Sequence, residues 1–129
     1  MLHSTIICFI FALYNKNIIE MKLENTKAQM RKGFLEMITL LIISKKEAYP
    51  SDIIKSLKEN ELIVVEGTMY PLLTRLKNAE FLSYNWKESS SGPPRKYYSL
   101  TEKGQEFLGE LTTTWQGLKN AVESISKTK

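Results

Sequence analysis

Residues 67–80 carry side chains that are well suited to contacts with nucleic acid. Their polar members offer hydroxyls, a guanidinium, an ammonium and an amide, which hydrogen-bond base edges and phosphate oxygens. These are Thr68, Tyr70, Thr74, Arg75, Lys77 and Asn78. Apolar residues recur with the spacing of one buried helical stripe, at Met69, Leu72, Leu73 and Leu76. The segment therefore predicts an amphipathic helix whose polar face is open to a partner, although alone it is more typical of an ordinary solvated helix.

A hairpin with a basic end is predicted directly after this helix. Residues 81–87 and 95–100 are aromatic-rich runs of strand length, and turn-forming residues separate them at positions 88–94. Pro93 and Pro94 should keep the tip from extending the strand ladder. Arg95 and Lys96 then stand beside a turn where a phosphate backbone could pass. The alternative is that these two cations only keep an exposed strand edge soluble.

Two helices must precede and support this pair of elements. Residues 29–43 are apolar on nearly every side from Phe34 onward, which predicts a helix enclosed by neighbours. A second helix should start at the boundary formed by residues 49–51, because Pro50 suits a first turn. The residues expected to be buried on it are Ile53, Ile54 and Leu57.

The start of the polar helix and the run before it can also be predicted. Residues 62–65 are rich in β-branched side chains and are predicted to form a strand that joins the hairpin as a third. Because proline is tolerated in a first turn, Pro71 places the start of the polar helix between Val65 and Thr68. The expected order is helix, helix, strand, helix, strand, strand, and then a last helix.

The last helix shows a heptad pattern. Thr101 is the expected N-cap, with Glu102 in the first turn and Phe107 docked on the hairpin. Apolar residues then recur at spacings of three and four, at Leu108, Leu111, Trp115, Leu118, Val122 and Ile125. So narrow a stripe favours a contact with another helix, and we expect it to be a dimer interface. The alternative is that the helix folds back on its own domain.

Two segments of the sequence resemble the PadR family of winged-helix transcriptional regulators. They are Glu66-Gly67-Thr68-Met69-Tyr70-Pro71-Leu72-Leu73-Thr74-Arg75-Leu76 and Gly92-Pro93-Pro94-Arg95-Lys96-Tyr97-Tyr98-Ser99-Leu100-Thr101-Glu102-Lys103-Gly104. The last four residues alone occur in several winged-helix families, whereas both segments in this order are specific. The resemblance runs from about Gln29 to the C-terminus. It departs from the family pattern at residues 79–81, where a glycine is common.

The resemblance implies a fold class and a domain organisation. The fold is expected to be mainly α with a small β-hairpin (α+β), a winged helix-turn-helix followed by a long C-terminal dimerisation helix. Residues 21–100 would form the DNA-binding domain and residues 101–129 the dimerisation helix. The function implied is that of a cytoplasmic, sequence-specific regulator, a repressor that binds double-stranded DNA as a homodimer.

The same resemblance assigns roles to the polar residues. Tyr70, Thr74 and Arg75 would reach into the major groove, and Thr68 and Lys77 would contact the backbone. Arg95 and Lys96 in the wing would bind phosphates beside or within the minor groove. Family members also place the start of the helix that contains Arg31 and Lys32 near the DNA backbone, although these two cations could simply solvate a helix end. These nine residues are the expected DNA-binding set.

Trp115 has a second expected role besides packing. In a helix pair a tryptophan is first a packing residue whose indole N–H needs a partner. Small PadR members with a single C-terminal helix can bind flat aromatic compounds between two tryptophans at the dimer interface, and Trp115 falls at the comparable position. The resemblance therefore implies a small aromatic effector that contacts Trp115.

Composition agrees with a single globular domain and excludes several kinds of site. The chain has 129 residues, 43% of them hydrophobic and 25% charged, with a net charge of +4 and a pI near 9.1. One cysteine, Cys8, excludes an internal disulfide, and one histidine, His3, excludes a catalytic triad in the body. We expect no metal, no cofactor and no enzyme activity.

Residues 1–20 form an apolar leader of uncertain status. The apolar run Ile6 to Tyr14 is too short to cross a bilayer, which takes about 20 residues, so no stable membrane insertion is expected. It also lacks the cationic start and cleavage site of a signal peptide. Either it packs on the body or a partner, or the chain made in the cell begins at Met21. The second interpretation is preferred, and an intact cellular mass that includes residues 1–20 would refute it.

Two other functions remain open at this point. The winged helix could be a protein-interaction module, whose binding would depend little on salt and would not need Arg95. The protein could also be a membrane-associated sensor, if the leader inserts shallowly into a lipid interface.

Overall fold

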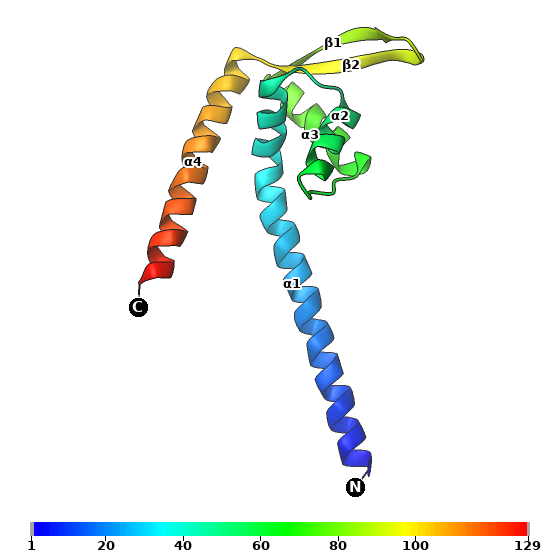
Figure 1. Cartoon of the computed structure of the whole chain (residues 1–129), viewed down its shortest axis with the longest axis vertical. Helices are drawn as coiled ribbons and strands as arrows, with labels where there is room; N and C mark the ends of the chain where they lie inside the picture. The colour runs from blue at the N-terminus through cyan, green and yellow to red at the C-terminus, as the bar shows by residue number, and fades with distance from the viewer. Residues whose placement is uncertain (1, 129) are drawn as a thin grey trace. The chain divides into compact units, whose positions relative to one another are not determined.

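The computed structural model describes residues 2–128, which form four helices and one hairpin (Figure 1). The elements are α1 (Leu2–Lys45), α2 (Pro50–Glu59), α3 (Glu66–Asn78), β1 (Leu82–Ser89), β2 (Gly92–Leu100) and α4 (Glu102–Lys127). The mainly α fold with a small hairpin and a long last helix confirms the predicted class. By compactness the chain divides into two units, Met1–Leu35 and Glu36–Lys129.

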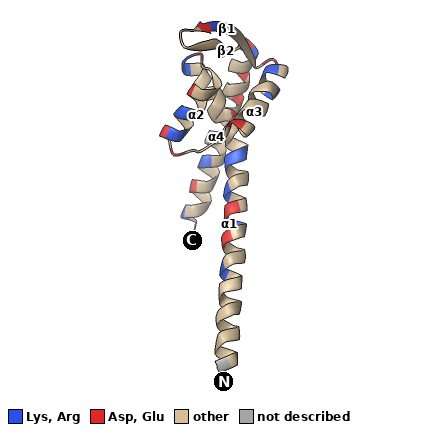
Figure 2. Ribbon diagram, turned by 90° about the vertical axis from the view of Figure 1, so that its right-hand side faces the viewer, with Lys and Arg blue, Asp and Glu red and all other residues tan. Residues whose placement is uncertain are grey.

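In the first unit, the described residues lie entirely in α1. We predicted a helix from Gln29, and this start was wrong, because α1 is continuous from Leu2. No proline precedes Pro50 and Gly33 is the first glycine, so nothing in the sequence breaks the helix earlier. Its first turns carry no Lys, Arg, Asp or Glu (Figure 2), and the apolar side chains of Ile6 to Tyr14 are exposed.

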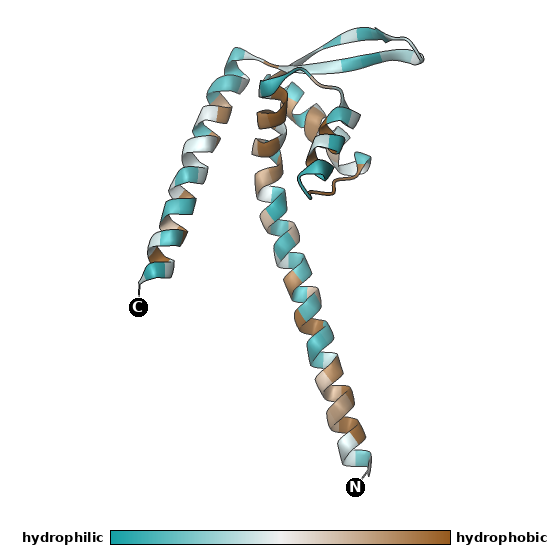
Figure 3. Cartoon of the chain, in the orientation of Figure 1, coloured by the Kyte–Doolittle hydropathy of each residue, from teal (hydrophilic) through white to brown (hydrophobic). Residues whose placement is uncertain are grey.

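These apolar turns appear brown in Figure 3, as do the last turns of α1. Across residues 2–128 no helix has both the length and the apolarity required to cross a bilayer. The two interpretations of residues 1–20 stay predictions.

The second unit contains the core. Side chains from the end of α1, from α2, α3 and α4, and from the hairpin bury one another there, so the apolar stripe of α3 faces the other elements as predicted. The core residues include Met37, Leu40, Ile43, Ile53, Leu57, Met69, Leu72, Leu73, Leu76, Leu82, Tyr98 and Leu108. The last turns of α1 are less enclosed than we expected, since Leu41 is 36% exposed.

The predicted starts of α2 and of α4 are confirmed. Pro50 opens α2, and the main-chain N–H of Tyr49 donates to the carboxylate of Asp52 at 3.3 Å. Thr101 is the N-cap of α4, where its hydroxyl accepts a hydrogen bond from the N–H of Gly104 at 2.9 Å. Phe107 stacks on Phe81, the residue before β1, with ring centroids 4.0 Å apart and an interplanar angle of 5°.

Pro71 lies deeper in α3 than predicted. The helix starts at Glu66, within the predicted window, which places Pro71 in its second turn instead of its first. The main-chain bond that proline cannot make would go to the carbonyl of Gly67. Gly67 is exposed, so water can reach that carbonyl and the proline is tolerated.

Two helices end with a glutamate in the left-handed backbone region. Glu61 follows α2 with φ 63°, and Glu80 follows α3 with φ 68°. In both places the chain turns back in a Schellman arrangement. The N–H of Phe81 donates to the carbonyl of Leu76 at 3.0 Å, and that of Leu62 to Leu57 at 2.8 Å.

The strand predicted at residues 62–65 is absent, and this prediction was wrong. These residues form an irregular connection between α2 and α3, in which Ile63 is 82% and Val65 64% exposed. The sheet described by the structure has two strands, β1 and β2. The free edge of β2 also forms a single antiparallel bridge with the segment before α2, in which Ala48 and Tyr98 exchange main-chain hydrogen bonds of 3.1 and 2.8 Å.

The hairpin itself is longer than predicted. The ladder pairs Leu82 with Leu100 at its base and still pairs Ser89 with Gly92 at its tip, with an irregularity between Lys87 and Ser89. The turn is therefore confined to residues 90 and 91, and the two prolines lie within β2. They are accommodated because each strand of a two-stranded sheet is an edge and because a bulge interrupts the register.

Candidate nucleic-acid interface

The polar face of α3 is open to solvent. Tyr70 is 49% exposed, and the other predicted contact residues of this helix are exposed as well. They are Thr68, Thr74, Arg75 and Lys77. The buried stripe lies on the opposite side, so α3 is held by its apolar side chains while five polar ones are free to meet another molecule. This is the arrangement that reading a DNA groove with a helix requires.

The two wing cations, although adjacent in sequence, contact different aromatic rings. The guanidinium of Arg95 lies 4.6 Å from the ring centroid of Tyr49, which precedes α2. The ammonium of Lys96 lies 4.4 Å from the Tyr84 ring and 5.3 Å from the Trp86 ring. Alternation along β2 sends the two side chains to opposite faces of the hairpin. Each cation is thereby oriented by an aromatic surface.

Tyr84 connects the hairpin of β1 and β2, here called the wing, to α3. Its ring receives Lys96 from β2 and also Lys77 from α3, whose ammonium lies 5.6 Å from the ring centroid. The ring centroids of Tyr84 and Trp86 are 6.2 Å apart in an edge-on arrangement. Cations from α3 and from β2 therefore lie near the same aromatic ring, so Tyr84 is in contact with both elements.

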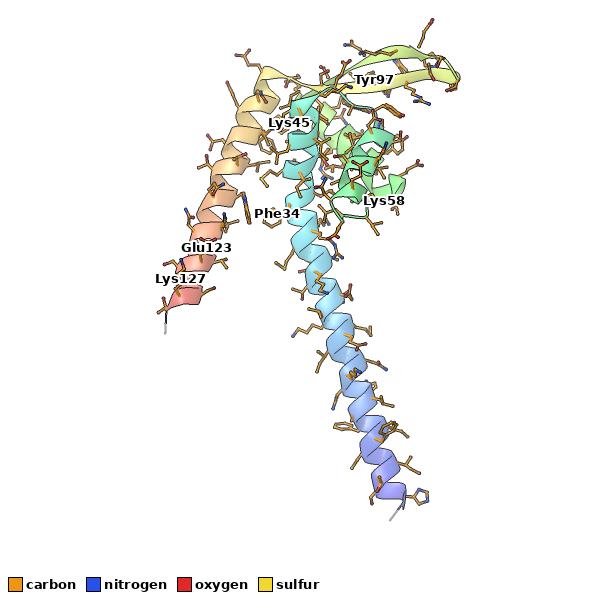
Figure 4. All side chains as sticks on the ribbon, viewed as in Figure 1. Phe34, Lys45, Lys58, Tyr97, Glu123 and Lys127 are labelled. Carbon is orange, nitrogen blue, oxygen red and sulfur yellow. The ribbon has the colours of Figure 1, made fainter. Side chains whose placement is uncertain are left out.

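The other face of the hairpin is tied to the segment that precedes α2. Lys87 forms an ion pair with Glu47, and its ammonium lies 4.9 Å from the ring centroid of Tyr97. Tyr97, labelled on β2 in Figure 4, in turn packs against Tyr49 with ring centroids 5.3 Å apart. These contacts anchor the middle and outer part of the wing, next to the tip rung, to the segment before α2.

A hollow of about 510 Å³ lies between α3, the start of α2 and the hairpin. Its walls include Ser51, Tyr70, Thr74, Trp86, Arg95 and Lys96. The described residues that line it include no Asp or Glu. The hollow thus combines hydroxyls, aromatic rings and cations.

A buried tyrosine lies behind this surface. Tyr98 is 5% exposed and also lines the hollow. Burial, and to a smaller extent the proximity of Tyr84 and Tyr70, raises the pKa of the Tyr98 phenol above its ordinary value.

Sequence reasoning missed three aromatic residues of this surface. Tyr49, Tyr84 and Trp86 were counted only as boundary or strand residues, yet all three contact the wing cations. Alternation in the strands could have found two of them, since Tyr84 and Trp86 share a face and Trp86 pairs with Lys96 across the ladder.

Arg31 and Lys32 lie in the first unit, on α1, and both are exposed. Cys8 is exposed and free. Within residues 2–128 the structure shows no group of three or more His, Cys, Asp or Glu side chains that could bind a metal ion.

The predicted interface residues of α4 become more exposed along the helix. Leu108 is buried within its own chain, with 7% of its surface exposed, and Leu111 and Trp115 are half-buried. Leu118, Val122 and Ile125 are 54%, 63% and 73% exposed. The first part of α4 therefore packs on the body, and its second part presents an apolar stripe to solvent.

Comparisons with known proteins agree with this geometry. The model of the PadR-like family of transcriptional regulators matches residues 39–110. A PadR-like transcription factor from Bacteroides fragilis is 61% identical, covering 78% of this chain and 98% of its own, with a TM-score of 0.68. A PadR-like transcriptional regulator from Bacillus cereus is 38% identical, covering 78% of this chain and 99% of its own, with a TM-score of 0.70.

Two further relatives extend the comparison. A PadR family transcriptional regulator from Eggerthella lenta is 29% identical, covering 85% of this chain and 96% of its own, with a TM-score of 0.77. An uncharacterised protein of Lysinibacillus sphaericus is 29% identical over 100 residues, which are 75% of this chain and 92% of that protein. The family model matches more than half of the 129 residues, and the matched range contains α3 and the wing. The chain therefore belongs to the PadR-like family of transcriptional regulators.

Proposed function

We propose that this transcriptional regulator is a repressor that acts in the cytoplasm and binds double-stranded DNA as a homodimer. The observation that carries the proposal is the open polar face of α3 beside a basic hairpin. In this proposal Tyr70, Thr74 and Arg75 contact base edges in the major groove. Thr68 and Lys77 contact the adjacent backbone, and the wing cations bind phosphates at the minor groove.

Arg31 and Lys32 complete the proposed set of DNA-binding residues. Both are exposed cations, and each phosphate that such a side chain neutralises makes binding more dependent on salt. We assign residues 21–100 to the DNA-binding domain and residues 101–129 to the dimerisation helix.

The exposed stripe on the second part of α4 supports the dimer. Leu118, Val122 and Ile125 repeat at spacings of four and three, which suits a narrow helix–helix seam. Leu111 and Trp115 extend the seam toward the body, and Leu108 holds the start of α4 in place from within its own chain. Two copies joined in this way would place their α3 helices in successive major grooves, about 34 Å apart.

A small aromatic effector would act through Trp115 in this proposal. By contacting the seam it would bias the angle between the two α4 helices, and with it the spacing of the two α3 helices. Titration of planar aromatic drugs, followed by tryptophan fluorescence in the wild type and in Trp115→Phe, tests this step. No response to any drug in the wild type, or an equal response in both proteins, would count against it.

The central experiment is a gel-shift of the purified protein against duplex DNA from upstream of its own gene, across a salt series. We expect a specific complex whose affinity falls steeply as salt increases, because phosphate contacts release counterions. Sedimentation equilibrium of the same sample should give twice the mass of one chain. A strictly monomeric protein, or one with no affinity for duplex DNA in dilute buffer, would overturn the proposal.

A further inference from the structure

Trp86 is a large apolar side chain that the wing leaves in solvent. It is 61% exposed, although Leu82 and Tyr98, on the same face of the hairpin, are buried at its base. Lys96 is its partner across the ladder and lies over its ring. Removing the apolar surface of an indole ring from water is favourable, so a partner that covers the ring of Trp86 would bind more tightly.

The hollow beside Trp86 is bounded on one side by α3. Tyr70 and Thr74 of α3 line one side, and Trp86 with Lys96 lines the other. The lining carries cations, hydroxyls and rings but no carboxylate among the described residues. Its charge is therefore complementary to a phosphate, and its rings are complementary to an apolar group beside that phosphate.

We infer that this hollow binds one deoxyribose of the DNA backbone and the two phosphates that flank it, with Trp86 packed on the sugar and Lys96 and Arg95 on the phosphates. The inference rests on the proposed function and adds a residue and a backbone position to it. When a helix occupies the major groove and a hairpin occupies the adjacent minor groove, the backbone that separates the two grooves passes between them. The hydroxyls of Ser51 and Thr74 are further donors to that backbone.

The contact made by Trp86 differs from those of the cations in its salt dependence. A lysine that neutralises a phosphate adds to the slope of log affinity against log salt concentration. A ring packed on a sugar releases no counterion, so its loss weakens binding without changing that slope. Trp86 is thus separable from its neighbour Lys96 by one series of measurements.

The first test compares three variants in duplex binding across a salt series. Trp86→Ala should weaken binding about tenfold at every salt concentration, comparable to the loss of an aromatic stacking partner, whereas Trp86→Phe should retain most of the affinity. Asn85→Ala changes the neighbouring exposed residue on the other face of β1 and should leave the affinity as in the wild type. Equal affinities for Trp86→Ala and the wild type would overturn the inference and leave the proposed function intact.

The second test needs no loss of affinity. Acrylamide quenching of tryptophan fluorescence is measured in the wild type and in Trp86→Phe, each with and without saturating duplex. The chain has two tryptophans, so Trp115 is the one that remains in the variant. Protection by DNA in the wild type that disappears in Trp86→Phe supports the inference.

Other outcomes count against one proposal or the other. A wild-type complex that forms in the gel-shift without any protection, or with the same protection in Trp86→Phe, contradicts the role of Trp86. The absence of any complex contradicts the proposed function itself.

Discussion

The hydroxyl of Thr101 donates a hydrogen bond of 2.6 Å to the main-chain carbonyl of Glu80, while it accepts the capping bond from Gly104. The side chain of Thr101 therefore joins the end of α3 to the start of α4. The main-chain N–H of Thr101 also donates to the carbonyl of Phe81 at 3.1 Å. The end of α3 and the beginning of α4 are thus held together directly, across the base of the hairpin.

Replacing Thr101 by valine should lower the free energy of unfolding by about 1–2 kcal/mol, because valine keeps the shape and loses the cap. Thr101→Ser keeps the hydroxyl and is the matched control. Urea unfolding of the three proteins measures the difference. Equal stability of the valine and serine variants would show that neither hydrogen bond contributes.

Gly104 should not tolerate a side chain. A Cβ at this position would overlap the carbonyl oxygen of Phe81 and lie 3.0 Å from its carbonyl carbon. We expect Gly104→Ala to destabilise the protein by about 1–3 kcal/mol, since main chain must shift to make room. Gly109 lies on the same helix with nothing within 4 Å of an added Cβ, so Gly109→Ala should stabilise by about 0.5–1 kcal/mol. Thermal unfolding of both variants should give shifts of opposite sign.

Glycine should be better than glutamate at both left-handed helix ends. Glu80 has φ 68°, and its side chain forms an exposed ion pair with Lys103 at 3.6 Å, which contributes little to stability. Because left-handed backbone strains a residue with a Cβ, Glu80→Gly and Glu61→Gly should each stabilise by roughly 0.5–1 kcal/mol. Glu59→Gly, inside α2, should destabilise instead. If all three glycine variants move stability in the same direction, the backbone argument is wrong.

Arg75 and Lys96 should differ in what they contribute to DNA binding. Loss of an arginine contact to a base edge should cost about 1–3 kcal/mol and relax the preference at one position of the site. Loss of a phosphate contact should weaken all sequences alike and reduce the salt slope by about 1. Competition gel-shifts with a set of single-base variants distinguish Arg75→Ala from Lys96→Ala. Identical effects of both variants on every duplex would refute the assignment.

The buried phenol of Tyr98 should make stability fall at alkaline pH. Its pKa is raised in the folded chain by burial and by Tyr84 and Tyr70, so the unfolded phenol ionises first as pH increases. The contribution of Tyr98 is complete below the ordinary tyrosine value of 10.0 and is lost as pH rises above it, through the higher folded pKa. Tyr98→Phe should therefore lose less stability than the wild type over that alkaline range, measured by urea unfolding. Parallel pH profiles would contradict this.

The elements that could be predicted are those whose signals are local. Pro50, the apolar stripe of α3 and the cap at Thr101 each act within one or two turns, and α2, α3 and α4 begin where these signals place them. The strand predicted at residues 62–65 failed because a strand needs a partner. The outer edge of β2 pairs with Ala48 instead. This bridge joins residues far apart in the sequence, so the sequence around either residue does not predict it.

The candidate site could be predicted in part for the same reason. The cations and hydroxyls of α3 and the wing were identified from residue type and helical spacing. The aromatic rings that orient the cations depend on the register of the hairpin, which pairs Trp86 with Lys96 and extends the ladder to Ser89 and Gly92. We predicted a turn over residues 88–94, and with so long a turn the cross-strand pairing of Trp86 with Lys96 could not be derived.

The short turn at residues 90 and 91 makes the two ends of the hairpin differ in stiffness. Residues 90–93 are all exposed, and a two-stranded ribbon without a packed face is only marginally stable by itself. Bending this end of the ribbon therefore requires little energy, whereas displacing its base would break the bridge at Ala48 and the core around Leu82. If the wing occupies the minor groove as proposed, a stiff base with a compliant end would let it fit duplexes whose minor grooves differ in width.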